Sequence, residues 1–586
     1  MLSSITELNL VILITVSLTF SYRSSGQPGG YYAEYREMIY VHLDKQVYAT
    51  GEPIRYKVYA GNPNRPDQQP LSRVVYFTLT GTRNKSVVSW RIPLHGRSAA
   101  GHFTLPDGLK SGMYILTAYT NWMRNGAEDL FFTQNLLIVS LSESTPDTLM
   151  VDGPDVKTPV LDSSTPGAPV IRLNTDKRAY QANEKVRLEI GLEHQKPGDA
   201  HADLSVSVSA VVPYGDMLQT SGTDRWLSID SPMVKPYGTS AAPCFYRMEN
   251  RAFILSGSVK SRKDNTPLAN GSIILSVIDS ISPRILYSRT DSLGNFLFYL
   301  SHLFDNRELI LQAGDLSIRN GYTWELDNKI VAANHRTYKP YRMNDEEKEF
   351  LNTTRNIRLI EAVYATSEVT HPPETTFEAT NYFSPADRIV YPGEYAELVN
   401  FKEIADNILP EVKFALRNDN YFLQVFNPKS AVWSECYMVL LNGIPFTDLT
   451  YIATLGTKAI ERIEVIMSNF FLGDLTLPGL VSIYTYDRKV AENYLKNNTL
   501  RYENTVITDG SSGGFVAEEP GYVFSDHYPD FRHTLLWKPD VQVTGSENLV
   551  IEFPVSKLSG TYQINVRGLT SLGYPLSTSA TFEVNE

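Results

Sequence analysis

Few residues in this 586-residue sequence are spaced as a catalytic site requires. Residues 510–514, Gly-Ser-Ser-Gly-Gly, match the G-x-S-x-G pattern around the nucleophilic serine of hydrolases. That pattern works on a strained strand-to-helix turn, which projects the serine hydroxyl towards a histidine. Here the flanking residues favour turns and no helical pattern comes after them. We therefore interpret the segment as a flexible linker.

A second motif has the spacing of zinc ligands. His371 and Glu374 enclose two prolines, which gives the H-x-x-E spacing of a metallocarboxypeptidase zinc site. The prolines favour an extended loop, and a third ligand would have to come from His527 or His533 in another expected domain. We predict a surface loop at residues 371–374 and solvated or core histidines at the other two positions.

The remaining reactive residues also favour a structural role. Cys244 and Cys436, the two cysteines, lie in no C-x-x-C pair and are predicted to be small, idle thiols, although a disulfide between domains stays open. Glu346, Glu347 and Glu349 lie together on an expected helix and are predicted to form a solvated face. The sequence has no phosphate-binding glycine loop and no EF-hand. We predict no catalytic residue, no cofactor and no metal site.

Three tryptophans are candidates for ligand binding. Trp122, Trp433 and Trp537, with the tyrosine-rich strands, have the aromatic faces that stack on sugars. Because β-sandwiches also need large aromatic residues in their cores, a core position is the favoured interpretation and a glycan-binding face is the alternative.

Composition indicates a folded, β-rich protein and narrows its partners. The chain is 42% hydrophobic, with 35 Tyr, 25 Phe and 33 Pro, which favours strands joined by many turns. Its net charge of −12 repels phosphate, so nucleic acid is not an expected partner. The length predicts roughly four domains.

The first 26 residues read as a secretory signal peptide. Residues 9–22 are apolar over the length of a signal-peptide core, and small residues stand at 24–26. No cysteine comes directly after them, so no lipid anchor is expected there. No later segment approaches eighteen apolar residues, and the mature chain is predicted to be exported and to lack a transmembrane helix.

A spaced repeat organises the chain after the signal peptide. Residues 39–60 and 171–192 both read as strand, turn and strand, and five residue types recur at identical spacing: Asp44, Lys45, Tyr48, Glu52 and Arg55 correspond to Asp176, Lys177, Tyr180, Glu184 and Arg187. Such a repeat predicts a string of similar β domains and favours holding or binding over chemistry.

The pattern of strands and turns predicts a mainly β fold of tandem immunoglobulin-like sandwiches with one small α+β unit. The first sandwich, residues 31–141, has seven expected strands: 39–43, 54–59, 74–80, 87–92, 101–105, 112–119 and 130–139. The other expected parts are a linker at 142–169, a second β domain with a long loop at 170–250, a third at 251–320, the α+β unit at 340–490, a flexible linker at 508–530 and final β-strands at 531–586.

Three blocks of the first domain resemble a known family. The blocks YVHLDK-x2-Y-x2-GE, LPDGL-x-SGMY and AYTNWMRN are similar to the macroglobulin-type MG2 domain of large exported proteins of Gram-negative bacteria. The resemblance implies an immunoglobulin-like, macroglobulin-like β-sandwich. Protease-trapping macroglobulins need a thioester in a Cys-Gly-Glu-Gln run, whereas Cys244 lies in Pro-Cys-Phe-Tyr, so that chemistry is absent.

Two later parts resemble domains of outer-membrane receptors. The third β domain, through the blocks at 256–259, 267–270 and 290–296, resembles the carboxypeptidase-regulatory-like domain, an accessory β-sandwich that implies no peptidase. The α+β unit, through 441–445, 460–466 and 479–483, resembles the plug domain of TonB-dependent receptors, with Asn442 in place of the usual aspartate and residues 475–478 in place of glycines. Too few residues come after Thr485 for a barrel of some twenty-two strands, so a plug-like unit without its barrel is expected.

These observations predict a non-catalytic envelope protein, in which the sandwiches are spacers and the plug-like unit docks on an outer-membrane protein or receptor barrel. Its place would be the periplasm, the outer membrane or the cell surface, with peripheral membrane association. The alternative is a carbohydrate- or nutrient-capture protein. An enzyme of another kind would need a polar pocket of clustered titratable groups, and no sequence block indicates one.

Overall fold

The computed structural model describes most of the chain. The described residues are 36–62, 65–82, 86–126, 130–152, 170–193, 201–214, 218, 246–277, 284–300, 308–313, 321–327, 329–330, 338–364, 386–395, 398–417, 420–436, 438–487, 499–503, 515–516 and 530–585. Over these residues the protein is mainly β with few helices, as the sequence predicts.

The first unit is a two-sheet sandwich with an aromatic core. One sheet contains β1 (Met38–Leu43), β3 (Pro53–Gly61) and β6 (Ser98–Thr104). The other has the order β2 (Val47–Ala49), β8 (Phe132–Val139), β7 (Gly112–Tyr119), β4 (Val74–Gly81) and β5 (Ser86–Pro93). The seven expected strands are confirmed within a few residues. Phe77 and Trp90 stack in the core with ring centroids 4.9 Å apart.

The repeated residues fix the path by which the chain crosses between the two sheets. Between β1 and β3 it contributes β2 to the opposite sheet, parallel to β8. The Tyr48 hydroxyl donates to Asp44 Oδ1 at 2.8 Å, and that oxygen accepts the Arg55 amide at 3.1 Å. Lys45 pairs with Glu52, which also accepts the Ala49 amide.

The second copy forms the same network. Tyr180 donates to Asp176 at 2.7 Å, Arg187 N donates to the same carboxylate at 2.8 Å, and Lys177 pairs with Glu184. The corresponding strand β11 (Ala179–Gln181) again runs parallel to a strand of the opposite sheet. The repeat therefore encodes a crossover, not a reactive site.

The second sandwich joins segments that are more than 300 residues apart. One sheet has the order β10 (Val170–Thr175), β12 (Lys185–Glu193) and β34 (Leu549–Pro554). The other has the order β11, β36 (Pro575–Asn585), β35 (Gly560–Thr570), β13 (His201–Ala210), β33 (Thr534–Thr544) and β32 (Phe515–Val516). From the sequence, 170–250 and 531–586 are expected to be separate parts, whereas in the structure β13 lies between β33 and β35. The buried face of β13, which includes Val206 and Val208, needs those two neighbours to leave water.

The third sandwich is also closed by a distant strand. One sheet has the order β17 (Asn295–Leu300), β14 (Phe253–Ser261) and β19 (Tyr322–Leu326). The other has the order β16 (Arg284–Arg289), β15 (Ser272–Val277), β18 (Glu308–Ala313) and β31 (Thr499–Glu503). Strand β31 comes after the α+β unit in sequence, so that unit is inserted within this sandwich.

In the described residues, the α+β unit combines small sheets with short helices. Its main sheet has the order β21 (Arg388–Val390), β27 (Ile460–Ile466), β30 (Leu480–Thr485), β25 (Val439–Leu441) and β26 (Ile444–Phe446). A second sheet contains β22 (Val412–Arg417), β23 (Asn420–Asn427) and β24 (Val432–Cys436), and β28 (Phe470–Leu472) pairs with β29 (Leu475–Leu477). The helices are η4 (Pro392–Glu394), α4 (Phe401–Asn407), α5 (Leu449–Thr454) and η5 (Thr457–Ala459).

Two asparagine residues, Asn400 and Asn442, explain local features of this unit. Apolar residues recur at helical spacing over residues 395–409, but α4 starts only at Phe401, because the Asn400 side chain caps its first turn by accepting the Glu403 amide at 3.0 Å. Asn442 and Gly443 both have positive φ, 52° and 81°, as a type I′ hairpin turn requires. Asn442 also donates to Thr485 Oγ1 and accepts the Thr485 amide, and an ionised aspartate lacks the donor for the first of these bonds.

Helix α3 (Asp345–Tyr364) is the helix expected around Glu346, Glu347 and Glu349. It packs on the first sandwich beside β9 (Thr148–Asp152) and β20 (Tyr338–Arg342). The predicted solvated face is wrong for Glu347, which is buried. Its carboxylate accepts the Asn344 amide and the Tyr341 hydroxyl, both at 2.8 Å, while the Asn344 side chain accepts the Glu347 amide. This reciprocal cap withdraws Glu347 from solvent, whereas Glu346 and Glu349 are exposed.

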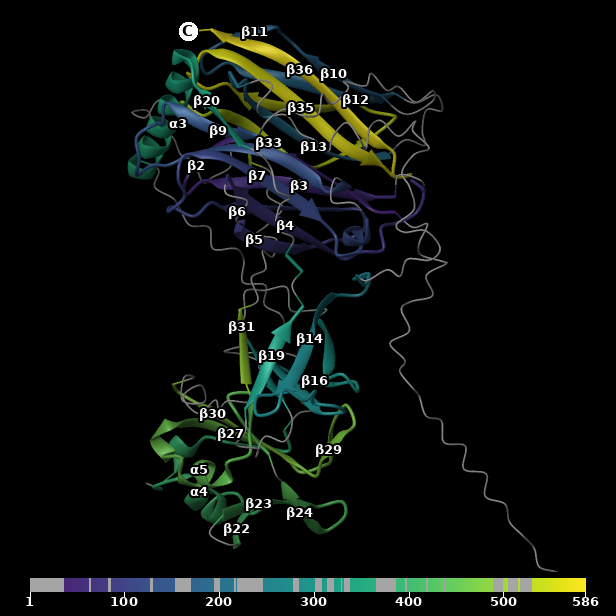
Figure 1. The fold of residues 1–586 in the computed structure, drawn as a ribbon, viewed down its shortest axis with the longest axis vertical. Coiled ribbons are helices and arrows are strands. Elements are labelled where there is room, and N and C mark those ends of the chain that lie inside the picture. The colour runs from purple at the N-terminus through teal and green to yellow at the C-terminus, as the bar shows by residue number, and fades with distance from the viewer. Residues whose placement is uncertain are drawn as a thin grey trace, which may run out of the picture.

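The four units stack along one axis (Figure 1). The first and second sandwiches form the upper body, with α3 at one side, the third sandwich lies below them, and the α+β unit forms the lower end. One hydrophobic cluster runs through the first and third sandwiches, and another joins the third to the α+β unit. In the described part of the chain, no helix has the length and apolar character needed to cross a bilayer.

Candidate functional site

Several residues singled out in the sequence lie outside the described residues. These are the signal-peptide segment 1–26, residues 510–514, His371, Glu374, His527 and Cys244. Cys436 is a buried free thiol, and burial raises its pKa to about 11, so it is protonated at neutral pH. His533 is buried, which corresponds to the core alternative for that residue. Among the described residues, no three His, Cys, Asp or Glu side chains gather in a way that would hold a metal ion.

The three candidate tryptophans separate into two classes. Trp122 and Trp537 are 1% and 2% exposed and belong to the core, as favoured from the sequence. Trp433 is 39% exposed on the edge strand β24. Of the three positions, only Trp433 in the α+β unit is therefore open to a glycan.

Exposed hydrophobic side chains are concentrated in the α+β unit. Of the nineteen large hydrophobic residues that are exposed in the described chain, nine lie between residues 386 and 487: Ile389, Tyr391, Tyr395, Val399, Leu416, Val432, Trp433, Phe471 and Tyr486. This unit supplies far fewer than half of the described residues. Contiguous exposed apolar side chains mark interaction sites more often than isolated ones do.

Four of these residues lie around η4 and η5, and we call them the tyrosine patch: Tyr391, Tyr395, Val399 and Tyr486. They are between 47% and 71% exposed. The chain holds them together through η5, because Thr457 N donates to the Val399 carbonyl at 3.2 Å and Tyr486 N donates to the Ala459 carbonyl at 3.1 Å. Helix η4, between the first two tyrosines, contacts both β27 and η5. The patch is thus built from three chain segments.

Among the described residues, the strand that leads into the tyrosine patch lies at the end of its sheet and has one unpaired edge. Strand β21 ends the main sheet and pairs, among the described residues, with β27 alone. Its side chains fix its position, since Arg388 pairs with Glu411 at 3.2 Å and Asp387 accepts the Met467 amide at 2.7 Å. Ile389 is 50% exposed on it. An edge of this kind presents backbone donors and acceptors to an added strand.

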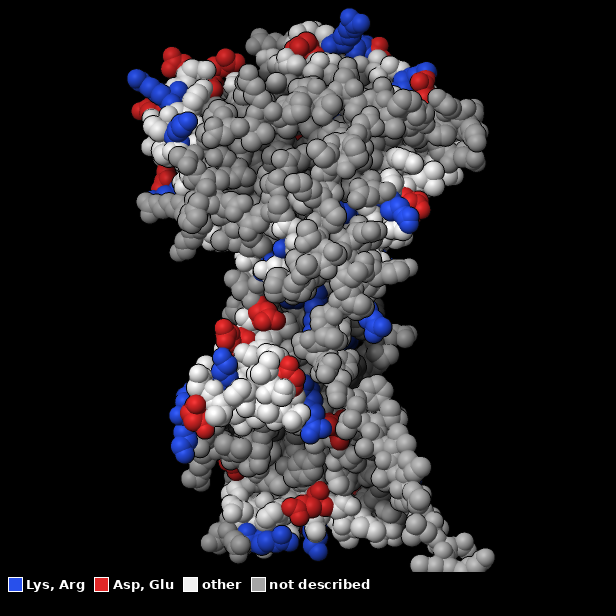
Figure 2. Space-filling model, turned by 45° about the vertical axis from the view of Figure 1, so that its right-hand side comes forward, with Lys and Arg blue, Asp and Glu red and all other residues white. Residues whose placement is uncertain are grey.

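Charge near the patch is locally compensated. On β27, Arg462 pairs with Glu464 at 2.9 Å and lies 3.8 Å from the centre of the Tyr484 ring. Burial raises the pKa of Tyr484 to about 12, with Glu464 adding to the rise, so its phenol is neutral at pH 7. Figure 2 shows both signs of charge scattered over the lower part of the molecule, with uncharged residues between them. The surface therefore favours apolar contact over attraction to a strongly charged ligand.

A second feature is the outer face of β22, β23 and β24, which we call the Trp433 face. The ring centroids of Trp433 and Phe426 lie 5.4 Å apart, and the Lys413 ammonium lies 5.9 Å from the indole centre. On the same face the Arg417 guanidinium lies 4.8 Å from the Phe422 ring. Aromatic rings flanked by cations are able to stack on a planar or sugar ligand.

Comparisons with known proteins give no family. No protein-family model and no curated protein matches the sequence. Among solved structures, an α2-macroglobulin of Salmonella reacted with methylamine aligns at 7% identity and a TM-score of 0.23, over 94% of this chain and 39% of that one. Trypsin-activated α2-macroglobulin of Escherichia coli gives 8% and 0.23, over 96% and 42%, and the native E. coli protein gives 9% and 0.22, over 94% and 40%.

The chain thus spans about two fifths of the length of those macroglobulins. At such identities and TM-scores the likeness supports no conclusion on function. The assignment of β-sandwiches rests on the strand pairing of this chain.

Sequence reasoning did not find the tyrosine patch or the β21 edge. Tyr391 and Tyr395 stand in the run Tyr-Pro-Gly-Glu-Tyr, which has turn composition and no periodicity that would reveal exposure. The available signal is that two large aromatic residues flank a turn, outside any expected core strand. The patch offers phenol hydroxyls, apolar surface and an open backbone edge, which suit binding to a protein.

Proposed function

We propose that this chain is an exported, non-catalytic binding protein of the Gram-negative envelope, and that its α+β unit docks on a protein partner. The observation that carries the proposal is the concentration of exposed hydrophobic side chains in this unit, beside an open sheet edge. Tyrosine is enriched in protein interfaces because it combines apolar area with a hydrogen-bonding hydroxyl. The resemblance of this unit to a receptor plug supports an outer-membrane barrel protein as the partner.

In this proposal the third sandwich holds the docking unit away from the upper body. The joint between the first and third sandwiches supports such a role. Lys329 pairs with the buried Glu249 at 2.6 Å, and the Tyr76 hydroxyl donates to the same carboxylate. Burial lowers the pKa of Lys329, which Glu249 partly offsets. A buried ion pair with a third partner favours one fixed geometry.

The test compares the tyrosine patch with a matched tyrosine elsewhere. The double variant Tyr391→Ser, Tyr486→Ser removes two rings of the patch, and the control Tyr299→Ser removes a ring that is 49% exposed on the third sandwich. Tagged full-length proteins are cross-linked in envelopes, purified and identified by mass spectrometry. We expect one outer-membrane barrel to be recovered with the wild type and the control and lost with the double variant. Equal recovery in all three would contradict the proposal.

Carbohydrate capture is a second candidate, favoured by the Trp433 face. Stacking on an exposed indole contributes to sugar binding, and Lys413 beside the ring would add a donor for hydroxyl groups. A glycan panel probed with wild type, Trp433→Ala and Tyr299→Ser tests it. Binding that Trp433→Ala alone abolishes would support capture, and no glycan bound by the wild type would dismiss it.

A further inference from the structure

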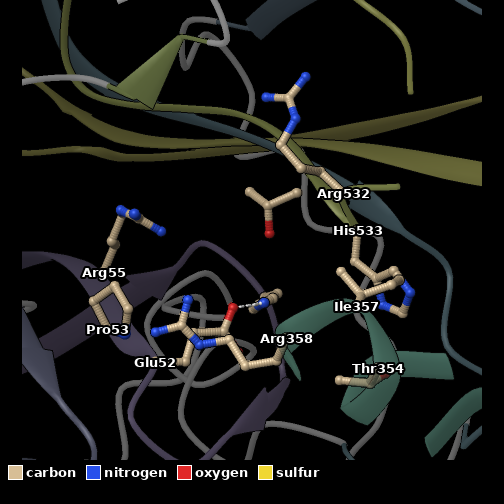
Figure 3. Close-up of a pocket in the computed structure, with 10 residues that line it drawn as sticks. Glu52, Pro53, Arg55, Thr354, Ile357, Arg358, Arg532 and His533 are labelled. Atoms are coloured by element: carbon tan, nitrogen blue, oxygen red, sulfur yellow. Dashed lines mark hydrogen bonds and ion pairs between the residues drawn. The ribbon is translucent and has the colours of Figure 1, made fainter. Parts of the chain in front are cut away.

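A small cavity lies where the first sandwich, α3 and the second sandwich meet (Figure 3). Its volume is about 60 Å³, which is room for a few water molecules or one small ion. The crossover of the first repeat supplies Lys45, Glu52, Pro53 and Arg55, and α3 supplies Thr354, Ile357 and Arg358. The chain entering β33 supplies Arg532, His533 and Thr534. The elements that line the cavity belong to the upper body, whereas the tyrosine patch belongs to the α+β unit at the lower end (Figure 1).

On the uncharged side chains that line this cavity, two buried polar atoms have no partner among the described residues. These are His533 Nε2 and Thr534 Oγ1, on side chains that are 9% and 7% exposed. A buried polar group without a hydrogen bond costs about 1–3 kcal/mol, so native proteins rarely leave one unsatisfied. Figure 3 shows His533 beside Ile357 and Thr354, across the cavity from Glu52 and Pro53. Both residues line the cavity.

The surroundings of the two atoms are cationic. Four described lining residues are basic, namely Lys45, Arg55, Arg358 and Arg532, and Glu52 is the single carboxylate among the described lining residues. Three of these bases form ion pairs: Lys45 pairs with Glu52, Arg532 with Asp530 at 2.6 Å, and Arg55 with Asp44 at 3.6 Å. Arg358 donates to the neutral Gly51 carbonyl at 3.0 Å. Basic side chains thus outnumber carboxylates among the described lining residues, which favours an anion.

His533 is in the protonation state that suits such a guest. Burial, with the nearby Lys45 ammonium, lowers the pKa of His533 to about 3, so the ring is neutral at pH 7. A neutral imidazole carries one N–H, and an oxyanion beside Nε2 would select the tautomer that donates from that nitrogen. The Thr534 hydroxyl also donates. The Phe350 ring, with its centroid 4.8 Å from that of His533, packs against the imidazole.

The second copy of the repeat provides an internal comparison. Its Lys177 and Glu184 form the same pair as Lys45 and Glu52, but their side chains are 50% and 35% exposed instead of 12% and 15%. The first copy differs because α3 and residues 532–534 cover it. The network that both copies share explains the crossover between the sheets. The cavity is found at the first copy, which α3 and residues 532–534 cover.

We propose that this cavity binds a small oxyanion, either inorganic phosphate or a carboxylate, between Lys45, His533 and Thr534. The ligand would join the first sandwich, α3 and the second sandwich at one point. The proposal is independent of the docking function, because the two sites share no residue.

Calorimetric titration of the full chain with inorganic phosphate, and separately with acetate, tests the proposal. We expect at least one of the two anions to bind saturably, with one anion per chain. The anion that binds shows whether the site takes a phosphate or a carboxylate. Thr534→Val and His533→Phe should each weaken binding at least tenfold without loss of thermal stability, because neither polar atom has a protein partner among the described residues. Lys177→Met, which removes the equivalent ammonium from the exposed copy, should leave the affinity unchanged. Absence of saturable heat with both anions, or wild-type affinity in the two cavity variants, would overturn the proposal.

Discussion

At the residue scale, the repeat shows how one hydrogen-bond network acts in two environments. Asp44 and Asp176 each accept a tyrosine hydroxyl and the amide of an arginine. Asp44 is buried, whereas Asp176 is exposed. A buried carboxylate that loses a donor cannot replace it with water, and an exposed one can. The same substitution should therefore have unequal costs in the two copies.

We expect Tyr48→Phe to lower the free energy of unfolding of the first sandwich by about 1.5–3 kcal/mol, the cost of a lost hydrogen bond to a charged group. Tyr180→Phe should cost about 0.5–1 kcal/mol, because water solvates Asp176 in its place. Urea unfolding followed by hydrogen exchange, which reports each sandwich separately, measures both. Equal losses would show that burial of the carboxylate does not matter.

His42 gives the interface between the first and second sandwiches a dependence on pH. Its Nδ1 lies 2.6 Å from Ser205 Oγ, and its Nε2 lies 3.0 Å from Ser207 Oγ. Its ring packs against Trp537, with the ring centroids 5.2 Å apart. Burial, and then the Arg567 charge, lower its pKa well below 6.5. The unfolded chain then binds a proton that the folded protein does not, so stability falls as the pH drops below 6.5.

The expected loss from His42 is about 1.4 kcal/mol for each pH unit below 6.5, until its folded pKa is reached. His533 adds a similar loss between pH 6.5 and about 3. His42→Gln should keep a neutral hydrogen-bonding side chain and reduce the slope of melting temperature against pH between 6.5 and 5. An unchanged slope would mean that the imidazole does not control this interface.

At the element scale, strands were predictable and their partners were not. The apolar runs between turn residues located every strand of the first sandwich except the short crossover strand β2, because each of these strands buries apolar side chains in the core. The pairing of β13 with β35 joins Ser205 to Arg567, and no local pattern encodes such a contact. Glu347 was misjudged because charge composition was considered without the Asn344–Glu347 spacing, which is a capping box.

Removal of the C-terminal strands tests the composite second sandwich. A chain that ends at residue 529 lacks β33 to β36 and leaves the buried faces of β12 and β13 in water. We expect limited proteolysis to cleave within 170–210 while 38–139 stays protected. A control that lacks 386–487 should keep 170–210 protected, since that unit contributes no strand to this sandwich. Protection of 170–210 in the truncated chain would contradict the shared sandwich.

At the scale of the whole molecule, the chain is nested. It starts the second sandwich, builds the third, inserts the α+β unit, returns through β31 to the third and closes the second. The α+β unit therefore projects at one end of the stack (Figure 1), held by chain on both sides. The sequence alone predicted an α+β unit but not its placement, because nesting depends on pairings across hundreds of residues.

The nested arrangement supports the proposal that the projecting end is the docking end. Its interface with the third sandwich includes a bond from the Gln312 amide to the Pro445 carbonyl at 3.1 Å and a shared hydrophobic cluster. The third sandwich thereby covers one side of the α+β unit, while the tyrosine patch and the β21 edge stay exposed among the described residues.

Site-specific photo-cross-linking in living cells is the decisive measurement for docking through this end. A photoreactive amino acid replaces Tyr391 or Tyr486 in the tyrosine patch, and Tyr299 or Tyr574 as exposed controls on other units. We expect both patch positions to cross-link to the same outer-membrane protein and the controls to give no such product. Cross-links to that protein from the control positions only, or from none of the four, would contradict docking through the tyrosine patch.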